Sequence, residues 1–105
     1  RAIACRRCNT YITSSRYLVS RVRFPSAYRG FRGKAALYRT VYETTSAGPP
    51  TVQLMQTGAY TVRALTCTCC NAYLGWEIAR ASEESEAWKE GHAVLELQCV
   101  GEQED

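Results

Sequence analysis

Short runs of alternating apolar and polar residues recur along the chain, and this alternation is typical of half-buried β-strands. The runs cover residues 17–23, 35–43, 52–55, 59–66, 74–81 and 92–100. In the last run, the alternation places Leu95, Leu97 and Cys99 on one inward face. In the second, Leu37 and Val41 are expected on the face opposite the one that carries the tyrosines. The pattern predicts a mainly β protein with many short strands.

Turn-forming residues separate these runs. Residues 24–33 contain one Pro and two Gly and are predicted to form a loop. Residues 44–50, which end in Gly-Pro-Pro, are predicted to form a flexible turn. Over residues 82–90, Ser82 stands before glutamates in the position of a helix N-cap, which predicts a single helical turn.

Length and composition limit the size of the core. A chain of 105 residues supports one domain with a modest core, and a metal staple helps at that size. We predict one domain over residues 1–100 and a polar tail over 101–105. Hydrophobic content of 46% with 22% charged residues fits a globular protein. No apolar run approaches the roughly 20 residues of a membrane span, so we expect no membrane association.

Charge is distributed unevenly along the chain. Residues 1–42 contain nine Arg and one Lys with no acidic residue, whereas residues 83–105 contain eight acidic residues and one Lys. One interpretation is an Arg-lined surface for nucleic acid or an acidic partner. The other is that the basic and acidic halves face one another in the fold. The sequence leaves both interpretations open.

Four of the six cysteines form two Cys-x-x-Cys pairs, Cys5 with Cys8 and Cys67 with Cys70. Each such turn directs two thiolates at one point, and two turns together complete a tetrahedral four-sulfur site. Ligand softness and geometry favour zinc in such a site. Because the protein supplies all four ligands, we predict one structural Zn²⁺ with no open position for an activated water. The alternative is a set of disulfides in a secreted protein.

The remaining chemical groups do not suggest catalysis. Cys69 offers an alternative to Cys70, but the two-residue spacing of the first pair favours Cys70. Cys69 is then a neighbouring thiol, and Cys99 a core residue. His92, the only histidine, is expected to be partly exposed rather than a ligand. With no Gly-rich phosphate loop and no partner set for a nucleophile, we predict that the protein is not an enzyme.

The motifs follow one another in a distinctive order. They are Gly33-Lys34-Ala35-Ala36-Leu37-Tyr38, Met55-Gln56-Thr57-Gly58-Ala59-Tyr60-Thr61-Val62, Leu74-Gly75-Trp76-Glu77 and Trp88-Lys89-Glu90-Gly91-His92-Ala93-Val94-Leu95-Glu96. Together with the cysteine pairs, they resemble the Yippee family of small eukaryotic zinc-binding proteins, over about residues 5–97. The chain departs from the family pattern at Tyr60, where the family has His, and at Trp88 and His92, where it has Tyr and Lys. The loop at 24–33 also looks longer.

The resemblance implies a fold in which two antiparallel sheets meet at an angle and a zinc ion pins them at the apex, the β-tent. The thalidomide-binding domain of cereblon, the Mis18 centromere proteins and methionine sulfoxide reductase B share this architecture. Yippee proteins are implicated as subunits of the GID or CTLH ubiquitin ligase and carry no known catalytic activity. The resemblance therefore implies an intracellular protein, cytoplasmic or nuclear. It would be a non-catalytic protein-interaction module, a subunit or adaptor of such a complex.

The resemblance also implies a candidate ligand pocket. Cereblon-type relatives hold a cyclic imide in a cage of three Trp, and Tyr60 and Trp76 fall on two of these positions. Met55 or its neighbour Leu54 falls near the third, and Ile78 stands where the cage has an aromatic. We predict a shallow ligand-binding site lined by Met55, Tyr60, Trp76 and Ile78. Its aromatic faces would favour a cation or a flat amide as the ligand. The alternative is that these residues are simply core, and a further alternative function is nucleic-acid binding by the Arg-rich half.

Overall fold

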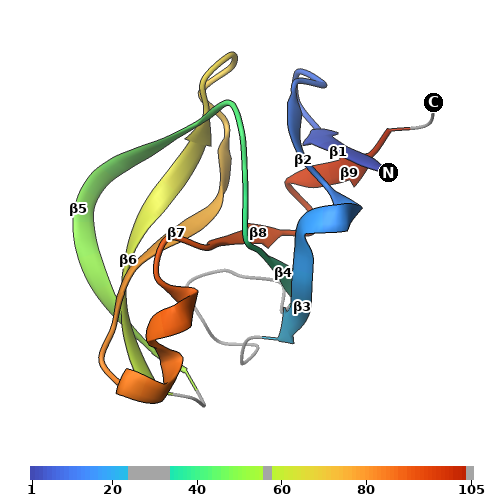
Figure 1. Cartoon of the computed structure of the whole chain (residues 1–105). Helices are drawn as coiled ribbons and strands as arrows, with labels where there is room; N and C mark the ends of the chain where they lie inside the picture. The colour runs from blue at the N-terminus through green and yellow to red at the C-terminus, as the bar shows by residue number, and fades with distance from the viewer. Residues whose placement is uncertain (24–33, 56–57, 104–105) are drawn as a thin grey trace.

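The computed structural model describes residues 1–23, 34–55 and 58–103, which form two antiparallel sheets (Figure 1). The smaller sheet has the strand order β2-β1-β9. The larger sheet has the order β3-β4-β8-β7-β6-β5. The elements are β1 (Ala2–Cys5), β2 (Tyr11–Ser14), η1 (Ser15–Tyr17), β3 (Leu18–Arg23), β4 (Lys34–Tyr38), β5 (Thr44–Met55), β6 (Gly58–Cys67), β7 (Tyr73–Ala81), η2 (Glu84–Lys89), β8 (Ala93–Glu96) and β9 (Val100–Glu102), where η marks a 3₁₀ helix. The predicted mainly β architecture of two antiparallel sheets is confirmed.

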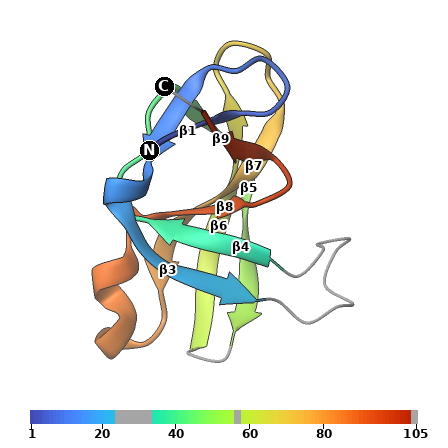
Figure 2. The ribbon, with the colours of Figure 1, turned by 90° about the vertical axis from the view of Figure 1, so that its right-hand side faces the viewer.

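The small sheet joins the two ends of the chain. β1 pairs with β2 on one side and with β9 on the other, and the Gln103 N–H donates to the Ala2 carbonyl at 2.9 Å. β9 takes in Gly101 and Glu102, two residues of the segment predicted as a polar tail. Figures 1 and 2 show the turn after β1 and the turn after β6 at the same end of the molecule, although the sequence places them far apart.

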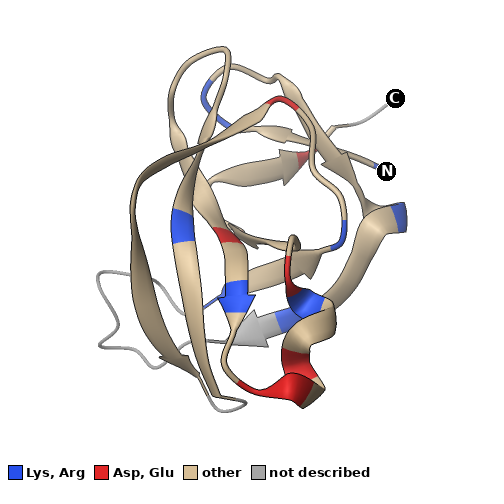
Figure 3. Cartoon of the chain, turned by 60° about the vertical axis from the view of Figure 1, so that its left-hand side comes forward, with Lys and Arg blue, Asp and Glu red and all other residues tan. Residues whose placement is uncertain are grey.

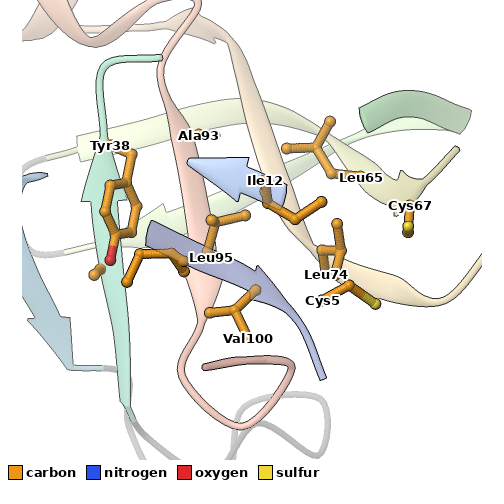
Figure 4. Close-up of a cluster of buried hydrophobic side chains, with 11 residues drawn as sticks. Cys5, Ile12, Tyr38, Leu65, Cys67, Leu74, Ala93, Leu95 and Val100 are labelled. Carbon is orange, nitrogen blue, oxygen red and sulfur yellow. The ribbon is translucent and has the colours of Figure 1, made fainter. Parts of the chain in front are cut away.

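One hydrophobic cluster fills the space between the two sheets (Figure 4). Ile3 and Ile12 of the small sheet meet Leu65, Leu74 and Leu95 of the large sheet, and all five are buried. Each such side chain contributes roughly 1.5–3 kcal/mol of hydrophobic stabilisation when fully buried. The cluster also contains the cysteines that end β1 and β6, so the core leads directly into the cysteine site.

A second hydrophobic cluster covers the opposite face of the large sheet. It contains Leu37, Tyr60, Val62, Trp76, Ile78 and Val94 together with Ala35. Successive residues of a strand point to opposite faces, so the central strands contribute to both clusters and are buried on both sides. This explains why all four residues of β8 are buried, although the sequence alternation suggested one inward face.

The prediction of a flexible turn over residues 44–50 is wrong, since these residues belong to the long strand β5. Among the described strands, β5 is at the edge of the large sheet and pairs only with β6. A proline lacks the N–H that a central strand must donate, but an edge strand tolerates it. The pairing register shifts between Ala47 and Thr51, and Gly48 adopts φ +76° there. The Gly-Pro-Pro sequence therefore forms an irregularity within a strand and not a connection between strands.

Two predicted strands are shorter than expected. The run 35–43 is a strand only to Tyr38, after which the chain leaves the sheet and the Tyr42 N–H donates to the Ile12 carbonyl at 2.6 Å. The run 92–100 divides into β8 and β9, separated by a turn in which the Cys99 N–H donates to the Glu96 carbonyl at 2.9 Å. The predicted loop at 24–33 lies outside the described residues.

The predicted helical turn is the 3₁₀ helix η2, with a different cap from the one expected. Its N-cap is Glu83, and the side chain of Ser82 instead accepts a hydrogen bond from the Ala59 N–H at 3.2 Å. Trp88 of η2 is 53% exposed and meets His92 edge-to-face at 5.6 Å between ring centroids. His92 is half-buried, as the sequence predicted.

The acidic and basic halves do not neutralise one another along an extended contact within the described residues. Where the structure describes the chain, the ion pair between the two halves joins Arg1 and Glu102 at 3.4 Å, with both side chains more than half exposed. Figure 3 shows acidic residues gathered at η2, and Lys and Arg residues spread over several strands. Among the described helices, none is long and apolar enough to cross a membrane.

Candidate metal centre

The two Cys-x-x-Cys turns have matching backbone geometry. In the first, the Asn9 N–H donates to the Cys5 carbonyl at 2.8 Å, and the Cys5 N–H donates to the Thr10 carbonyl at 2.9 Å. In the second, the Asn71 and Cys67 N–H groups make the corresponding bonds at 2.8 and 2.9 Å. Both asparagines adopt the left-handed conformation, with φ 65° and 63°. Asn reaches this region at lower cost than most residues, so it closes both turns.

The four thiol sulfurs of these turns meet at one point. All four, from Cys5, Cys8, Cys67 and Cys70, lie within 4.8 Å of one another. The Cys5 and Cys70 sulfurs are 3.6 Å apart, and the Cys8 and Cys67 sulfurs 3.5 Å. A disulfide requires about 2.05 Å. In a tetrahedron with metal–sulfur bonds of ~2.3 Å, neighbouring sulfurs lie about 3.8 Å apart. The observed distances therefore fit ligands around one metal ion.

The candidate site lies partly in the hydrophobic core and partly at the surface. Cys5 and Cys67 are each 1% exposed and pack in the core cluster, whereas Cys8 and Cys70 lie toward the surface. Each turn thus supplies one buried and one partly exposed sulfur. One turn connects β1 and β2 of the small sheet, and the other connects β6 and β7 of the large sheet. A metal held here would therefore join the two sheets at their common end.

Hydrogen bonds and burial move the thiol pKa values in opposite directions. The Thr10 hydroxyl lies 3.0 Å from the Cys8 sulfur, and this bond with the Thr10 backbone lowers the pKa of Cys8 from 9.0 to about 6. Desolvation raises the pKa of Cys70 to about 12. Cys8 is therefore the more readily ionised of the two, and a metal ion bound here would have to displace the proton of Cys70.

The other thiols lie outside this cluster. Cys69 is exposed, so the structure uses the ligand spacing that the sequence favoured. Cys99 is half-buried beside the core cluster. Burial and the nearby Glu96 carboxylate raise the pKa of Cys99 to about 11, so it is a protonated thiol at neutral pH.

The four residues of the predicted ligand pocket come together, but most of them face the interior. Tyr60 and Ile78 are 1% and 2% exposed, and Met55 packs against the same cluster. Of the four, only Trp76 lines a described cavity. Tyr60 and Ile78 therefore pack in the core, whereas Trp76 borders both the core cluster and the cavity, and ligand binding by these residues stays a prediction. Lys89 lies over Tyr60, with its ammonium 3.2 Å from the hydroxyl oxygen.

The cavity beside Trp76 has a volume of about 550 Å³ and lies where β5, β6 and β7 meet the chain after β8. Its apolar wall consists of Ala47, Pro49, Val62 and Ala64. Its polar residues include Gln53 and Glu96, which are 4% and 5% exposed. The sequence did not reveal this site, because the Gly-Pro-Pro sequence made residues 44–50 resemble a turn. A glutamate inside an otherwise apolar run of the sequence, Val94-Leu95-Glu96-Leu97, was the available signal.

A second surface feature gathers three tyrosines beside the first Cys-x-x-Cys turn. The ring centroids of Tyr11 and Tyr42 lie 5.9 Å apart, and those of Tyr17 and Tyr42 lie 6.2 Å apart. The guanidinium groups of Arg16 and Arg39 lie 5.7 and 5.2 Å from the centre of the Tyr17 ring. We call these five residues the tyrosine surface. It borders a shallow cavity of about 410 Å³.

Known proteins with the same pattern identify the family. A family described as "Yippee zinc-binding/DNA-binding /Mis18, centromere assembly" matches residues 2–102. The chain belongs to the Yippee/Mis18 family. A yippee-like protein of Schizosaccharomyces pombe is 34% identical over 105 residues, which is all of this chain and 76% of that protein. Protein yippee of Drosophila melanogaster is 34% identical over 95% of this chain and 78% of its own length.

A solved structure supports the same fold. The crystal structure of the Mis18 "Yippee-like" domain matches with a TM-score of 0.67, covering 99% of this chain and 96% of that chain. The two sequences are only 13% identical, so this similarity concerns the fold alone. The recognition of a Yippee-like fold from the motif order is thereby confirmed, and the family's description as zinc-binding agrees with the cysteine cluster.

Proposed function

We propose that this Yippee-family chain is a non-catalytic protein-interaction module that one structural zinc ion holds in shape. Cys5, Cys8, Cys67 and Cys70 would supply the four thiolates, because their sulfur distances fit a tetrahedral site. When bound, the ion cross-links the two sheets and adds on the order of 10 kcal/mol to folding. With four protein ligands, no position remains for a substrate or an activated water.

The observation that carries the interaction role is the exposed tyrosine surface. Tyr11 is 40% and Tyr42 43% exposed, which is high for aromatic side chains that stack on one another. Tyr and Arg are the residues that most often dominate binding energy in protein interfaces. Arg16 and Arg39 lie against Tyr17, so aromatic and cationic groups form one patch. We infer that this patch is the docking surface for a partner protein.

The candidate zinc site would fix the shape of this surface. Tyr11 begins β2, directly after the first Cys-x-x-Cys turn. Tyr42 precedes Glu43, whose backbone carbonyl accepts a hydrogen bond from the Thr68 N–H of the second turn at 3.0 Å. The Tyr42 hydroxyl donates to the Tyr17 hydroxyl at 3.4 Å. Both sides of the surface are thus tied to the metal ligands, and a preformed surface loses little entropy on binding.

Charge argues for a protein partner over nucleic acid. The chain carries a net charge of +3 and a pI near 8.6, below the values above 9 that are typical of nucleic-acid-binding domains. Glu43 lines the shallow cavity with Tyr11 and Tyr42, where it would repel phosphate. The Arg-rich half remains the alternative site for nucleic acid. A salt titration separates the two, because each phosphate contact steepens the dependence of log affinity on log salt by about 0.9 for duplex DNA.

The partner class that we propose is a subunit of a multiprotein ubiquitin ligase of the GID or CTLH type. This proposal rests on the family relationship. In such a complex, the chain would be a subunit or adaptor. Affinity purification with chemical cross-linking from the source cell would test it. We expect cross-links from ligase subunits to residues that border the tyrosine surface.

Paired variants test the surface itself. Tyr11→Ala combined with Tyr42→Ala should weaken partner capture at least about tenfold while metal content is unchanged. Trp88→Ala is the matched control, because Trp88 is also an exposed aromatic but lies in η2. Equal capture by the double tyrosine variant and the original chain would contradict the proposal, as would loss of capture by the Trp88 variant alone.

A further inference from the structure

The cavity beside Trp76 contains a buried acidic group that the metal centre and the tyrosine surface do not use. Glu96 is 5% exposed and lines the cavity. Among the described residues of the lining, Glu96 alone carries a formal charge. A buried carboxylate is costly unless its oxygens are hydrogen-bonded or paired with a cation. The position of this carboxylate in a cavity wall therefore needs a chemical explanation.

A short hydrogen-bond chain orients the carboxylate. The Trp76 indole N–H donates to the Tyr73 hydroxyl oxygen, and the Tyr73 hydroxyl donates to the Glu96 carboxylate. Burial, followed by the bond to Glu96, raises the pKa of Tyr73 well above its usual value, so the phenol stays a donor. An ionised carboxylate has about four acceptor positions. Tyr73 fills one, which leaves capacity for a donor that enters the cavity.

The rest of the lining suits the stem of a long side chain. Ala47, Pro49, Val62 and Ala64 provide an apolar wall, and Trp76 and Tyr73 add aromatic surface. Lys and Arg side chains bury their methylene stems on apolar walls of this kind while the charged head reaches a polar partner. Aromatic rings also attract cations. The volume of about 550 Å³ lies within the range of small-ligand sites.

We propose that this cavity binds the cationic end of a lysine or arginine side chain from a protein partner, with Glu96 as its counter-ion. Ammonium and guanidinium groups supply further N–H donors and a positive charge, and the described lining of the cavity contains no cationic side chain to balance Glu96. The Tyr73–Trp76 pair would hold the carboxylate in place and contact the stem. This site is separate from the tyrosine surface, so it goes beyond the proposed function and can fail without affecting it.

The test is an NMR titration of the full chain with small probes. n-Butylammonium and n-butylguanidinium represent the lysine and arginine ends, while 1-pentanol is a neutral probe of similar length and glutarimide a neutral cyclic imide. We expect both cations to shift the Trp76 indole N–H and the backbone amide of Gln98, and to bind at least about tenfold more tightly than 1-pentanol. The more tightly bound cation identifies the side chain.

Variants locate the binding. Glu96→Gln should remove the preference for cations over 1-pentanol. Gln98→Lys places a cation on an exposed residue of the lining and should weaken binding of both cations by about threefold to tenfold. Leu54→Lys adds the same charge at a residue that is 76% exposed and outside the lining, so it should leave binding unchanged. If the Glu96 variant does not fold, the comparison of Gln98→Lys with Leu54→Lys decides whether the cations bind in the cavity.

Three results would overturn the proposal. The first is no saturable shift at the Trp76 indole with either cation. The second is binding of 1-pentanol or glutarimide that equals or exceeds that of the cations. The third is an equal effect of Gln98→Lys and Leu54→Lys, which would indicate a general change in surface charge.

Discussion

Asn9 and Asn71 occupy the same place in two turns from opposite halves of the chain. Each follows the second cysteine of its pair, each has a φ near 65°, and each N–H donates at 2.8 Å to the carbonyl of the first cysteine. The two halves of the candidate metal site are therefore built by one local rule, Cys-x-x-Cys-Asn. Their shared geometry brings the four sulfurs to within 4.8 Å of one another.

Substitution of Asn71 tests this rule. Asn71→Gly should change the free energy of unfolding by less than about 0.5 kcal/mol, because glycine reaches the left-handed region freely. Asn71→Val should cost roughly 2 kcal/mol or more, since a β-branched side chain is strained there. Urea denaturation of zinc-loaded protein measures both. Equal stability of the two variants would show that the conformation at this position does not matter.

The neighbouring thiols provide a matched test of the ligand set. Cys70→Ser should unfold the chain, because the free energy lost with the metal exceeds the usual free energy of unfolding of a domain of this size. Cys69→Ser alters the adjacent, exposed thiol and should change stability by no more than about 0.5 kcal/mol. Cys99→Ala should cost about 1–2 kcal/mol through lost packing. Circular dichroism with metal analysis checks all three. If Cys69→Ser unfolds the chain and Cys70→Ser does not, the ligand is Cys69 and the proposed ligand set is wrong.

Thr10 should set the pH dependence of metal uptake. Its bonds lower the pKa of Cys8 from 9.0 to about 6, so Cys8 is a thiolate between these pH values in the folded, metal-free chain. Thr10→Val should return that pKa toward 9.0 and weaken zinc binding about tenfold at pH 7. The difference should disappear above pH 9, where both chains have ionised. It should be largest below pH 6, where both thiols must lose a proton to bind zinc and the Thr10→Val thiol loses it less readily. Chelator competition at several pH values measures it, and a gap that does not depend on pH would contradict the assigned cause.

Gly75 marks a close contact between β7 and β8. A Cβ atom there would collide with the Val94 carbonyl oxygen and come within 2.9 Å of the Leu95 Cα, both backbone atoms. Gly75→Ala should therefore cost about 3 kcal/mol or more. Gly91→Ala is the control, because its Cβ meets nothing within 4 Å and only its φ of +86° is unfavourable, at about 1 kcal/mol. Thermal denaturation measures both variants. Similar losses of stability in Gly75→Ala and Gly91→Ala would mean that β7 and β8 can separate to admit the methyl group.

Local patterns in the sequence predicted which four cysteines come together and the strands near them. Two residues between the cysteines suffice to fix a turn, and the motif order identified the fold of the whole chain. Burial of the predicted pocket depended on longer-range packing. The sequence places Tyr60 and Ile78 on a strand face, but the opposing residues of the cluster, such as Leu37, decide that they are interior.

The edge strand β5 also could not be predicted from local sequence. Gly48, Pro49 and Pro50 carry the local signature of a turn, and only the pairing of β5 with β6 shows that they extend a strand. The cavity beside Trp76 follows from that irregularity, since Ala47, Gly48 and Pro49 line it. Its acidic group was visible in the sequence as Glu96 in an apolar run, but its surroundings depend on three strands that meet only in the folded chain.

The most direct test of the account is the metal content of the folded chain. Native mass spectrometry with elemental analysis should find one zinc per chain, and thiol alkylation under denaturing conditions should find all six cysteines reduced. Removal of the zinc with a chelator should abolish the folded state. A folded chain without metal, or one with disulfides between Cys5 and Cys8 or between Cys67 and Cys70, would contradict the proposal that a single zinc ion joins the two sheets.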